Sequence, residues 1–275
     1  MVNFLRRVKR YLARHLRGPV QYVPVRIPVL QSELLKGHKA VITGGSSGIG
    51  LAIARAFLMN GASVVITGRD AARLSDAKKS LATNARVEAL VLDNAAPESF
   101  DAALATIGDF DILVNNAGYV GGGTFGSTQV SEFDKVLDTN LRGAYFLSQD
   151  VASVWIKKGI KGNILNICSA SSLRPGESPY ILSKWGLRSL TIGMAKKLIP
   201  HGIVVNGLAP GCTDTPQFCL NPEESINNPR NPAGRLVTVE EIGNMAVVLV
   251  SDMARMVVGD VVYMTGGGAI TTIDD

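Results

Sequence analysis

Tyr180 and Lys184 are the side chains of this 275-residue sequence best suited to acid–base chemistry. In a helix, residues four apart lie on the same face, so the phenol and the ammonium ion would be neighbours. An isolated tyrosine is a poor acid–base group near neutral pH, but a nearby cation favours its phenolate form. The pair therefore predicts a group that protonates a developing alkoxide or deprotonates an alcohol, although such pairs also occur on solvated helix faces.

A glycine-rich segment, Thr43-Gly-Gly-Ser-Ser-Gly-Ile-Gly50, lies between an apolar run and a helical pattern. Glycine permits positive φ and a close approach of the backbone to a ligand, and the free N–H groups of a helix start attract an anion. We expect a dinucleotide pyrophosphate here rather than an ordinary strand-to-helix turn, because the segment follows the first strand of an alternating chain. The predicted contacts are Gly44, Ser46, Ser47, Gly48, Ile49 and Gly50.

The choice of cofactor is predicted from the end of the second strand, Thr67-Gly-Arg69. A carboxylate there would bind the ribose hydroxyls of NAD(H), whereas an arginine can pair with the 2′-phosphate of NADP(H). Asp70 comes next, but we expect it to begin the following helix. The sequence therefore favours NADP(H), with NAD(H) as the alternative if Arg69 is only a solvated loop charge.

A polar partner for the substrate oxygen is expected at the carboxyl end of a neighbouring strand. The predicted strand 163–167 runs directly into Cys168-Ser-Ala-Ser-Ser172. We expect Ser169 to orient the substrate carbonyl, with Ser171 as the substitute, although serines also fill loops that have no such role.

Short apolar runs alternate with helical patterns from residue 39 onward, and these elements must position the residues above. Continuous apolar strands joined by helices imply parallel pairing with both faces covered. The predicted fold class is α/β, a Rossmann-like doubly wound parallel sheet in one dinucleotide-binding catalytic domain over 39–275. The loop 212–235, rich in proline, resembles a mobile lid. Strands are expected at 40–43, 63–67, 87–92, 111–115, 163–167, 203–207 and 261–264, and helices at 47–60, 70–82, 97–106, within 130–158, at 180–199 and at 238–252.

Residues 1–38 are predicted to be an N-terminal helical extension. Phe4, Val8, Leu12 and Leu16 recur every four residues among many arginines, which is typical of a basic amphipathic helix. Residues 1–39 carry nine Lys/Arg and one Glu, a net charge of +8, whereas the remainder carries nineteen Lys/Arg and twenty-two Asp/Glu, a net charge of −3. The extension could bind an anionic membrane surface or a partner, serve as an organelle presequence, or pack on an oligomer.

The bulk properties exclude several classes of protein. The acidic excess of residues 40–275 gives no basic groove for nucleic acid. Three cysteines form neither a metal-binding spacing nor an even disulfide framework, so we expect no metal and a cytoplasmic location. No apolar run approaches the length of a membrane span, and no signal peptide is evident.

Taken in order, these motifs closely resemble the short-chain dehydrogenase/reductase family over about residues 39–268. The resemblance rests on the glycine segment, Asn115-Asn-Ala-Gly118, Asn140, Ser169, the Tyr180–Lys184 pair, and Pro210-Gly211 with Thr215. It implies a catalytic tetrad of Asn140, Ser169, Tyr180 and Lys184, in which Asn140 holds a water that links Lys184 to solvent.

The resemblance also implies further cofactor contacts. Asn115-Asn-Ala-Gly118 would support the sheet beside the adenosine half, Asp93 would lie near the adenine, and the 210–215 stretch would contact the nicotinamide. Family members are usually dimers or tetramers, and the apolar last strand fits a homotetramer. Two departures are the Ser169–Tyr180 spacing of 11 positions, which is short, and Cys168 where a second serine is frequent. The implied contacts are Asp93, Asn115, Ala117, Gly118, Tyr180, Lys184, Pro210, Gly211, Thr213 and Thr215.

The predicted function is hydride transfer between NADP(H) and a secondary alcohol or ketone of small-molecule size. The substrate class stays open between sugar- or polyol-like metabolites, 3-oxoacyl groups and steroid-like ketones. The alternative is a catalytically silent nucleotide-binding sensor or scaffold.

Overall fold

The computed structural model describes residues 33–81, 86–215, 228 and 231–268. The predicted basic helix near the N-terminus lies outside the described residues, as does most of the predicted lid over 212–235. Among the residues that are described, no helix is both long enough and apolar enough to cross a lipid bilayer.

A seven-stranded parallel sheet forms the centre of the fold, as the alternating pattern predicted. The strands lie side by side in the order β3-β2-β1-β4-β5-β6-β7. The order reverses between β1 and β4, and in such sheets the crevice at the reversal is where ligands bind. The strands are β1 (Lys39–Thr43), β2 (Ser63–Gly68), β3 (Val87–Val91), β4 (Ile112–Asn115), β5 (Asn163–Ile167), β6 (Val204–Pro210) and β7 (Val261–Met264).

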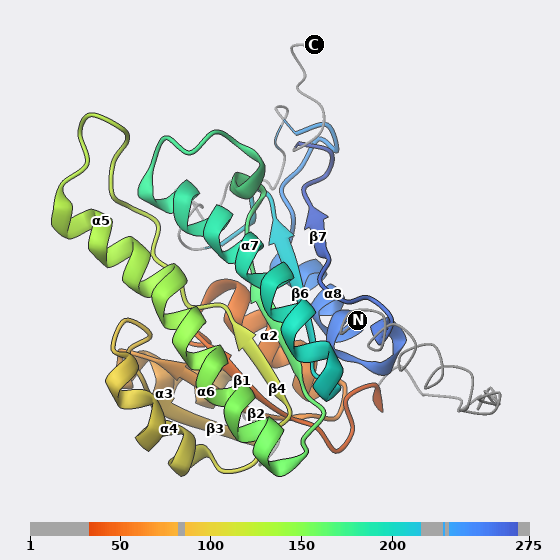
Figure 1. The fold of residues 1–275 in the computed structure, drawn as a ribbon. Coiled ribbons are helices and arrows are strands. Elements are labelled where there is room, and N and C mark those ends of the chain that lie inside the picture. Colours follow the sequence, from red (N-terminus) through yellow and green to blue (C-terminus); the bar gives the residue numbers. More distant parts are fainter. Residues whose placement is uncertain (1–32, 82–85, 216–227, 229–230, 269–275) are drawn as a thin grey trace, which may run out of the picture. The chain divides into compact units, whose positions relative to one another are not determined.

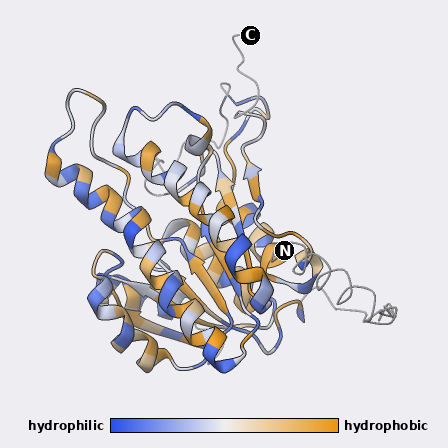
Figure 2. Cartoon of the chain, viewed as in Figure 1, coloured by the Kyte–Doolittle hydropathy of each residue, from blue (hydrophilic) through white to orange (hydrophobic). Residues whose placement is uncertain are grey.

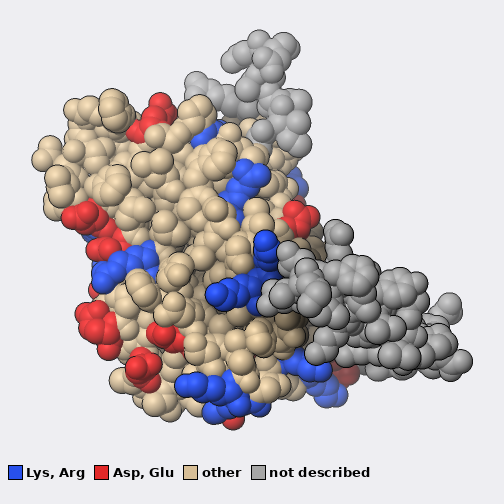
Figure 3. All heavy atoms as spheres, viewed as in Figure 1, with Lys and Arg blue, Asp and Glu red and all other residues tan. Residues whose placement is uncertain are grey.

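Helices cover both faces of the sheet, because each strand presents apolar side chains on both sides (Figures 1 and 2). One apolar core lies between the sheet and α2 (Gly48–Met59), α3 (Ala71–Leu81) and α8 (Val239–Val250). The other lies between the sheet and α4 (Phe100–Ile107), α6 (Gly143–Lys158) and α7 (Pro179–Leu198). Much of the outer surface above α6 and α7 carries neither Lys, Arg, Asp nor Glu (Figure 3).

The region 130–158 is helical, as predicted, and one irregular turn divides it. It consists of α5 (Val130–Leu137), a π-helical turn over Asp138–Arg142, and α6. No pattern in the sequence predicted this turn, which contains Asn140. A smaller difference is that β6 continues to Pro210 and so carries the chain to the edge of the sheet where the loops gather.

The amino-terminal edge of the sheet is tied together by His38 and Asp111. The Asp111 carboxylate accepts from His38 Nδ1 at 2.6 Å and from the Lys39 backbone amide at 3.0 Å, so it joins the starts of β1 and β4. The hydrogen bond from His38 to Asp111 raises the pKa of His38 above 6.5, and partial burial opposes this only in part. The charges of Asp111 and Asp252 raise it further.

We expect this pair to make stability depend on pH near neutrality. Because the folded-state pKa of His38 is raised, its contribution is complete below pH 6.5 and is lost as the pH rises through the folded-state pKa. The free energy of unfolding of the wild type should therefore exceed that of Asp111→Asn at pH 5.5 by up to about 1 kcal/mol, the range of half-exposed ion pairs, and by less at pH 9. Urea unfolding across this range measures the difference, and a gap that does not change with pH would contradict the assignment.

Candidate active site

The glycine segment forms a tight turn at the carboxyl end of β1, where backbone conformation and packing both require glycine. Gly44 and Gly48 have φ of 65° and 53°, in the left-handed region. A Cβ on Gly50 would lie 2.4 Å from the Gly44 carbonyl oxygen and 2.4 Å from Asn116 Nδ2. The backbone of the turn is therefore packed against the end of β4, with no room for a side chain at Gly44 or Gly50.

Two residues outside the predicted set hold this turn in place. The Asn116 amide group donates to the carbonyl oxygens of Thr43 and Gly44, at 2.9 and 3.1 Å. The Thr43 hydroxyl accepts from the backbone amides of Asn116 and Ala117, both at 3.0 Å. Asn116 was predicted only as part of a segment that supports the sheet. Its position in the sequence does not show that its side chain would form hydrogen bonds with the end of β1.

The start of α2 has the features of an anion site. Ser47 is the N-cap and is extended, but its side chain makes no capping hydrogen bond, and the first turn carries no acidic residue. The Thr215 methyl carbon would lie 3.7 Å from a Cβ on Gly48, so the loop after β6 reaches this turn. An uncapped helix start, the helix dipole and a glycine-rich turn fit a dinucleotide pyrophosphate.

Arg69 lies at the end of β2, where the adenosine ribose is expected. It is exposed, and among the described residues it forms no ion pair. Asp70 accepts from the Arg73 backbone amide at 3.0 Å and so begins α3, as predicted. The Ser46 hydroxyl would lie 3.7 Å from a Cβ on Gly68, on the same edge as Arg69.

Tyr180 and Lys184 lie in the first turns of α7, as the spacing predicted. Pro179 occupies the first helical position, and the Ser178 hydroxyl caps the helix by accepting from the Ile181 amide. Lys184 is 5% exposed, and its Nζ lies 5.8 Å from the centroid of the Tyr180 ring. Nζ donates to the Ile167 carbonyl oxygen at 2.9 Å, which fixes the ammonium ion at the end of β5.

Ser169 is the second residue after β5 and is buried. Its hydroxyl oxygen accepts from the Ser171 amide at 3.1 Å and caps a short 3-10 helix, Ala170–Leu173. No hydrogen bond within the described residues uses the Ser169 hydroxyl proton, so it can be donated to a ligand. Burial raises the pKa of the adjacent Cys168 thiol to about 11, which keeps this group protonated at neutral pH.

The short loop between Ser169 and Tyr180 is held from both sides. The Trp185 indole donates to the Arg174 carbonyl oxygen at 2.6 Å, and the Phe125 amide donates to the Glu177 carbonyl oxygen at 2.7 Å. The loop is therefore anchored to α7 and to the segment that follows β4.

Asn140 is 1% exposed and lies in the π turn, and both polar atoms of its side chain form hydrogen bonds. Oδ1 accepts from the Tyr119 amide at 2.7 Å, and Nδ2 donates to the Tyr119 carbonyl oxygen and to the Ser183 hydroxyl, both at 3.0 Å. Ser183 in turn donates to the Tyr180 carbonyl oxygen at 2.7 Å. Ser183 joins Asn140 to α7, and no motif in the sequence predicted this role.

The remaining predicted residues lie on the same edge of the sheet or just beneath it. The Asn115 side chain is buried and donates to Ser148 and Asn166, so it braces the sheet interior rather than facing the edge. Asp93 follows β3 and accepts from the Ala95 amide. Three others form the loop after β6: Pro210 ends the strand, the Gly211 amide donates to Met264, and the Thr213 hydroxyl donates to the Gly211 carbonyl oxygen.

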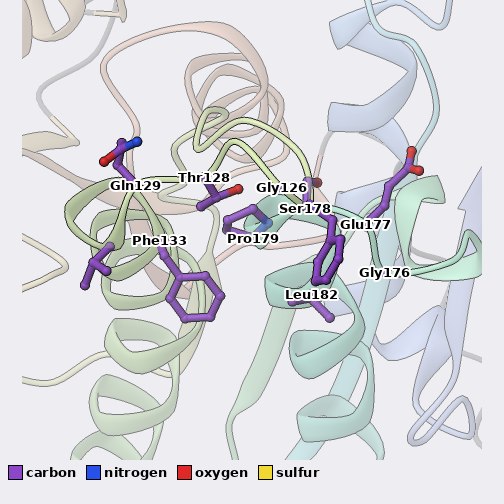
Figure 4. Close-up of a pocket in the computed structure, with 11 residues that line it drawn as sticks. Gly126, Thr128, Gln129, Phe133, Gly176, Glu177, Ser178, Pro179 and Leu182 are labelled. Atoms are coloured by element: carbon purple, nitrogen blue, oxygen red, sulfur yellow. The ribbon is translucent and has the colours of Figure 1, made fainter.

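A cavity of about 470 Å³ lies beside these groups, between α5 and the start of α7 (Figure 4). Phe133 and Leu182 contribute much of its apolar wall, and Glu177 lies at its edge. None of the four predicted tetrad residues lines it. The cavity therefore adjoins the acid–base residues but does not contain them.

Comparison with known proteins gives consistent matches over nearly the whole described region. A family model described as enoyl-(acyl carrier protein) reductase matches residues 44–269. Gluconate 5-dehydrogenase of Gluconobacter oxydans is 36% identical over 244 residues, which cover 85% of this chain and 95% of the relative.

Two solved structures share the fold. Gluconate 5-dehydrogenase of Burkholderia cenocepacia, in complex with NADP and tartrate, is 32% identical with a TM-score of 0.78 and covers 88% of this chain and 99% of its own. 3-Ketoacyl-(acyl-carrier-protein) reductase of Brucella melitensis, complexed with NADH, is 31% identical with a TM-score of 0.76 and covers 86% of this chain and 100% of its own.

Proposed function

Because this chain belongs to the short-chain dehydrogenase/reductase family of nicotinamide-dependent oxidoreductases, we propose that it interconverts a secondary alcohol and a ketone with NADP(H) as the cofactor. The observation that carries the proposal is the buried Lys184 ammonium ion, 5.8 Å from the ring of Tyr180 and hydrogen-bonded to the end of β5. This arrangement supports an acid–base role for the two residues, at the edge of the sheet that also carries the glycine turn.

The bound nicotinamide would supply the hydride for ketone reduction or accept it in alcohol oxidation. The Tyr180 phenol donates its proton to the substrate oxygen during reduction and takes it back during oxidation. The Ser169 hydroxyl, whose proton is not used within the described residues, donates a second hydrogen bond to the same oxygen and orients the carbonyl.

Lys184 serves the proton transfer by its charge and by its remaining N–H groups. Its positive charge lies 5.8 Å from the centroid of the Tyr180 ring, and one N–H is already fixed on the Ile167 carbonyl oxygen. A Cβ on Gly118 would lie 3.5 Å from Asn140 Oδ1 and 3.9 Å from Lys184 Nζ, so the two residues border the same small space. This supports a relay in which Asn140 holds a water that passes protons between Lys184 and solvent.

The cofactor would be held by the glycine turn, the start of α2 and the loop after β6. These groups provide amides for the pyrophosphate, and Thr215 lies beside Gly48 to complete the cradle. For the substrate, we propose a polar hydroxy or oxo compound of sugar-acid type as the first candidate, because two of the similar proteins are named gluconate dehydrogenases. A 3-oxoacyl thioester and a 3-oxosteroid are the other classes to test.

We expect Tyr180→Phe to separate catalysis from cofactor binding. Removing the phenol hydroxyl should lower turnover by at least about 100-fold, the lower range for a general acid–base group, while NADPH fluorescence titration gives a Kd within about twofold of the wild type. Turnover is followed by NADPH absorbance with 5-ketogluconate, an acetoacetyl thioester and a 3-oxosteroid.

Exposed Tyr145→Phe provides a matched control, because it removes a phenol hydroxyl from α6 and should leave turnover unchanged. If Tyr180→Phe retained wild-type turnover on a good substrate, the assignment of the proton donor would be wrong. If the wild type bound NADPH but reduced none of the three compounds, the result would favour the alternative, a catalytically silent nucleotide-binding sensor or scaffold.

We propose that Arg69 selects NADP(H) by pairing with the 2′-phosphate. Charge-assisted hydrogen bonds are worth about 1.5–3 kcal/mol, so Arg69→Ala should weaken NADPH binding by about tenfold or more and NADH binding by less than about twofold. Arg73→Ala is the matched control, because this arginine already pairs with Asp70 at 3.6 Å. An equal loss for the two cofactors would contradict the proposal.

We further propose a homodimer or homotetramer built on the largely uncharged part of the outer face of α6 and α7 (Figure 3). The half-exposed edge strand β7 provides a second surface that a tetramer could use. The exposed apolar side chains of α6 and α7 are Tyr145, Phe146, Val154, Ile156, Leu182, Trp185 and Ile192.

Light scattering after gel filtration should give at least twice the 29.1 kDa mass of one chain. Ile192→Glu should shift the mass towards the monomer, because a charge in an apolar interface is costly to bury. Met59→Glu changes an exposed methionine at the end of α2, on the opposite side of the sheet, and should have no effect. A monomeric wild type at micromolar concentration would refute the assembly.

A further inference from the structure

We propose that Asn94 is a positioning residue for the proton relay, because its side-chain amide completes the π turn that carries Asn140. The inference rests on the proposed function, since Asn140 must serve the relay for its position to matter. Asn94 lies in the loop after β3 and belongs to none of the motifs that predicted the site.

The hydrogen bonding of the π turn leaves one carbonyl without its usual donor. In an α-helix the Gly143 amide would donate to the Thr139 carbonyl oxygen, four residues earlier. Here it donates to the Asp138 carbonyl oxygen, five residues earlier. The Asn94 amide group donates to the Thr139 carbonyl oxygen at 2.7 Å and so replaces the missing helical hydrogen bond.

The orientation of the Asn94 side chain is set by this one contact. The residue is 6% exposed, and its Oδ1 atom is buried without a hydrogen-bond partner in the described part of the chain. If the Asn94 side-chain amide were flipped, its Oδ1 atom would face the Thr139 carbonyl oxygen, and two acceptors would lie in contact without a proton between them. A buried unpaired oxygen is costly, and its presence here is explained if the nitrogen on the same side chain is needed at the π turn.

The backbone of Asn94 is also packed tightly against the start of α6. A Cβ on Gly143 would lie 1.9 Å from the Asn94 carbonyl oxygen and 2.4 Å from its Nδ2. Only glycine leaves room for the loop at this point. The loop after β3 and the π turn are therefore in direct contact at Gly143.

The π turn decides which way Asn140 points. Its extra residue shifts the helical register, and one residue corresponds to about 100° of rotation in an α-helix. If the turn relaxed to an α-helix, Asn140 would rotate away from Tyr119 and Ser183, which now hold its amide group. It would also leave the space that it shares with Lys184.

The test compares Asn94→Leu, which has a similar shape but no donor, with the wild type on the most active of the three probe compounds. We expect kcat to fall by about tenfold, the cost of one unpaired buried carbonyl, with the Kd for NADPH changed by less than about twofold. The loss should largely disappear when Asn94→Leu is added to Asn140→Ala, because residues that act through one another are not additive. An equal loss in both backgrounds, or full activity of Asn94→Leu, would overturn the proposal.

Two further variants exclude a merely structural effect. Asn206→Leu removes another buried asparagine that donates to a backbone carbonyl, that of Val257 at 2.6 Å, and should lower stability without the kinetic signature. Asn94→Asp lacks the donor when ionised and regains one when protonated. Its kcat relative to Asn94→Leu should therefore rise as the pH falls from 8 to 5.5, and a constant ratio would count against the proposal.

Hydrogen exchange tests the same contact without any turnover. Amides of residues 140–144 should exchange about tenfold faster in Asn94→Leu than in Asn206→Leu, because the replacement for the lost helical bond is gone. Unchanged protection would refute the role of Asn94 in the turn. If the wild type reduces none of the probes, the proposed function fails, and hydrogen exchange alone then decides whether Asn94 holds the turn.

Discussion

The hydrogen bond from Lys184 to the Ile167 carbonyl oxygen is the contact on which the arrangement of the site depends. A buried ammonium ion is costly unless it is paired or hydrogen-bonded. This contact therefore holds α7 at one rotation about its axis and at one position along its axis, relative to the end of β5. Ser169 follows β5 within two residues, and Tyr180 lies one turn before Lys184 on the same helix. One hydrogen bond thus sets the positions of the two groups that would meet the substrate oxygen.

A series of buried polar side chains, linked by hydrogen bonds, also holds α6 and α7 against the sheet. Asn115 on β4 donates to Ser148 on α6 and to Asn166 on β5, and Asn166 donates to Thr191 on α7. These four residues are at most 4% exposed, and they join two strands to the two helices that carry the site. Apolar side chains would fill the same volume, but hydrogen bonds are directional and so specify one arrangement of these elements.

Much of the fold and the central part of the site could be predicted from the sequence. The strands are short, continuous apolar runs, and parallel strands bring their carboxyl ends to one edge, so motifs that follow β1, β5 and β6 had to meet there. The pair formed by Tyr180 and Lys184 depends only on helical spacing, which is a local property. The same is true of Asp70, whose position before a helical pattern predicted its capping role.

The residues that were not predicted form contacts between segments that are far apart in the sequence. Asn116 reaches β1 from the end of β4, Ser183 reaches the π turn from α7, and neither contact has a periodic signal. The π turn itself depends on a donor from a loop more than forty residues away, so no window of sequence around Asn140 contains the reason for it. Periodicity predicts which residues share a face, whereas a register shift inside a helix is decided by whichever distant group can satisfy the carbonyl that it releases.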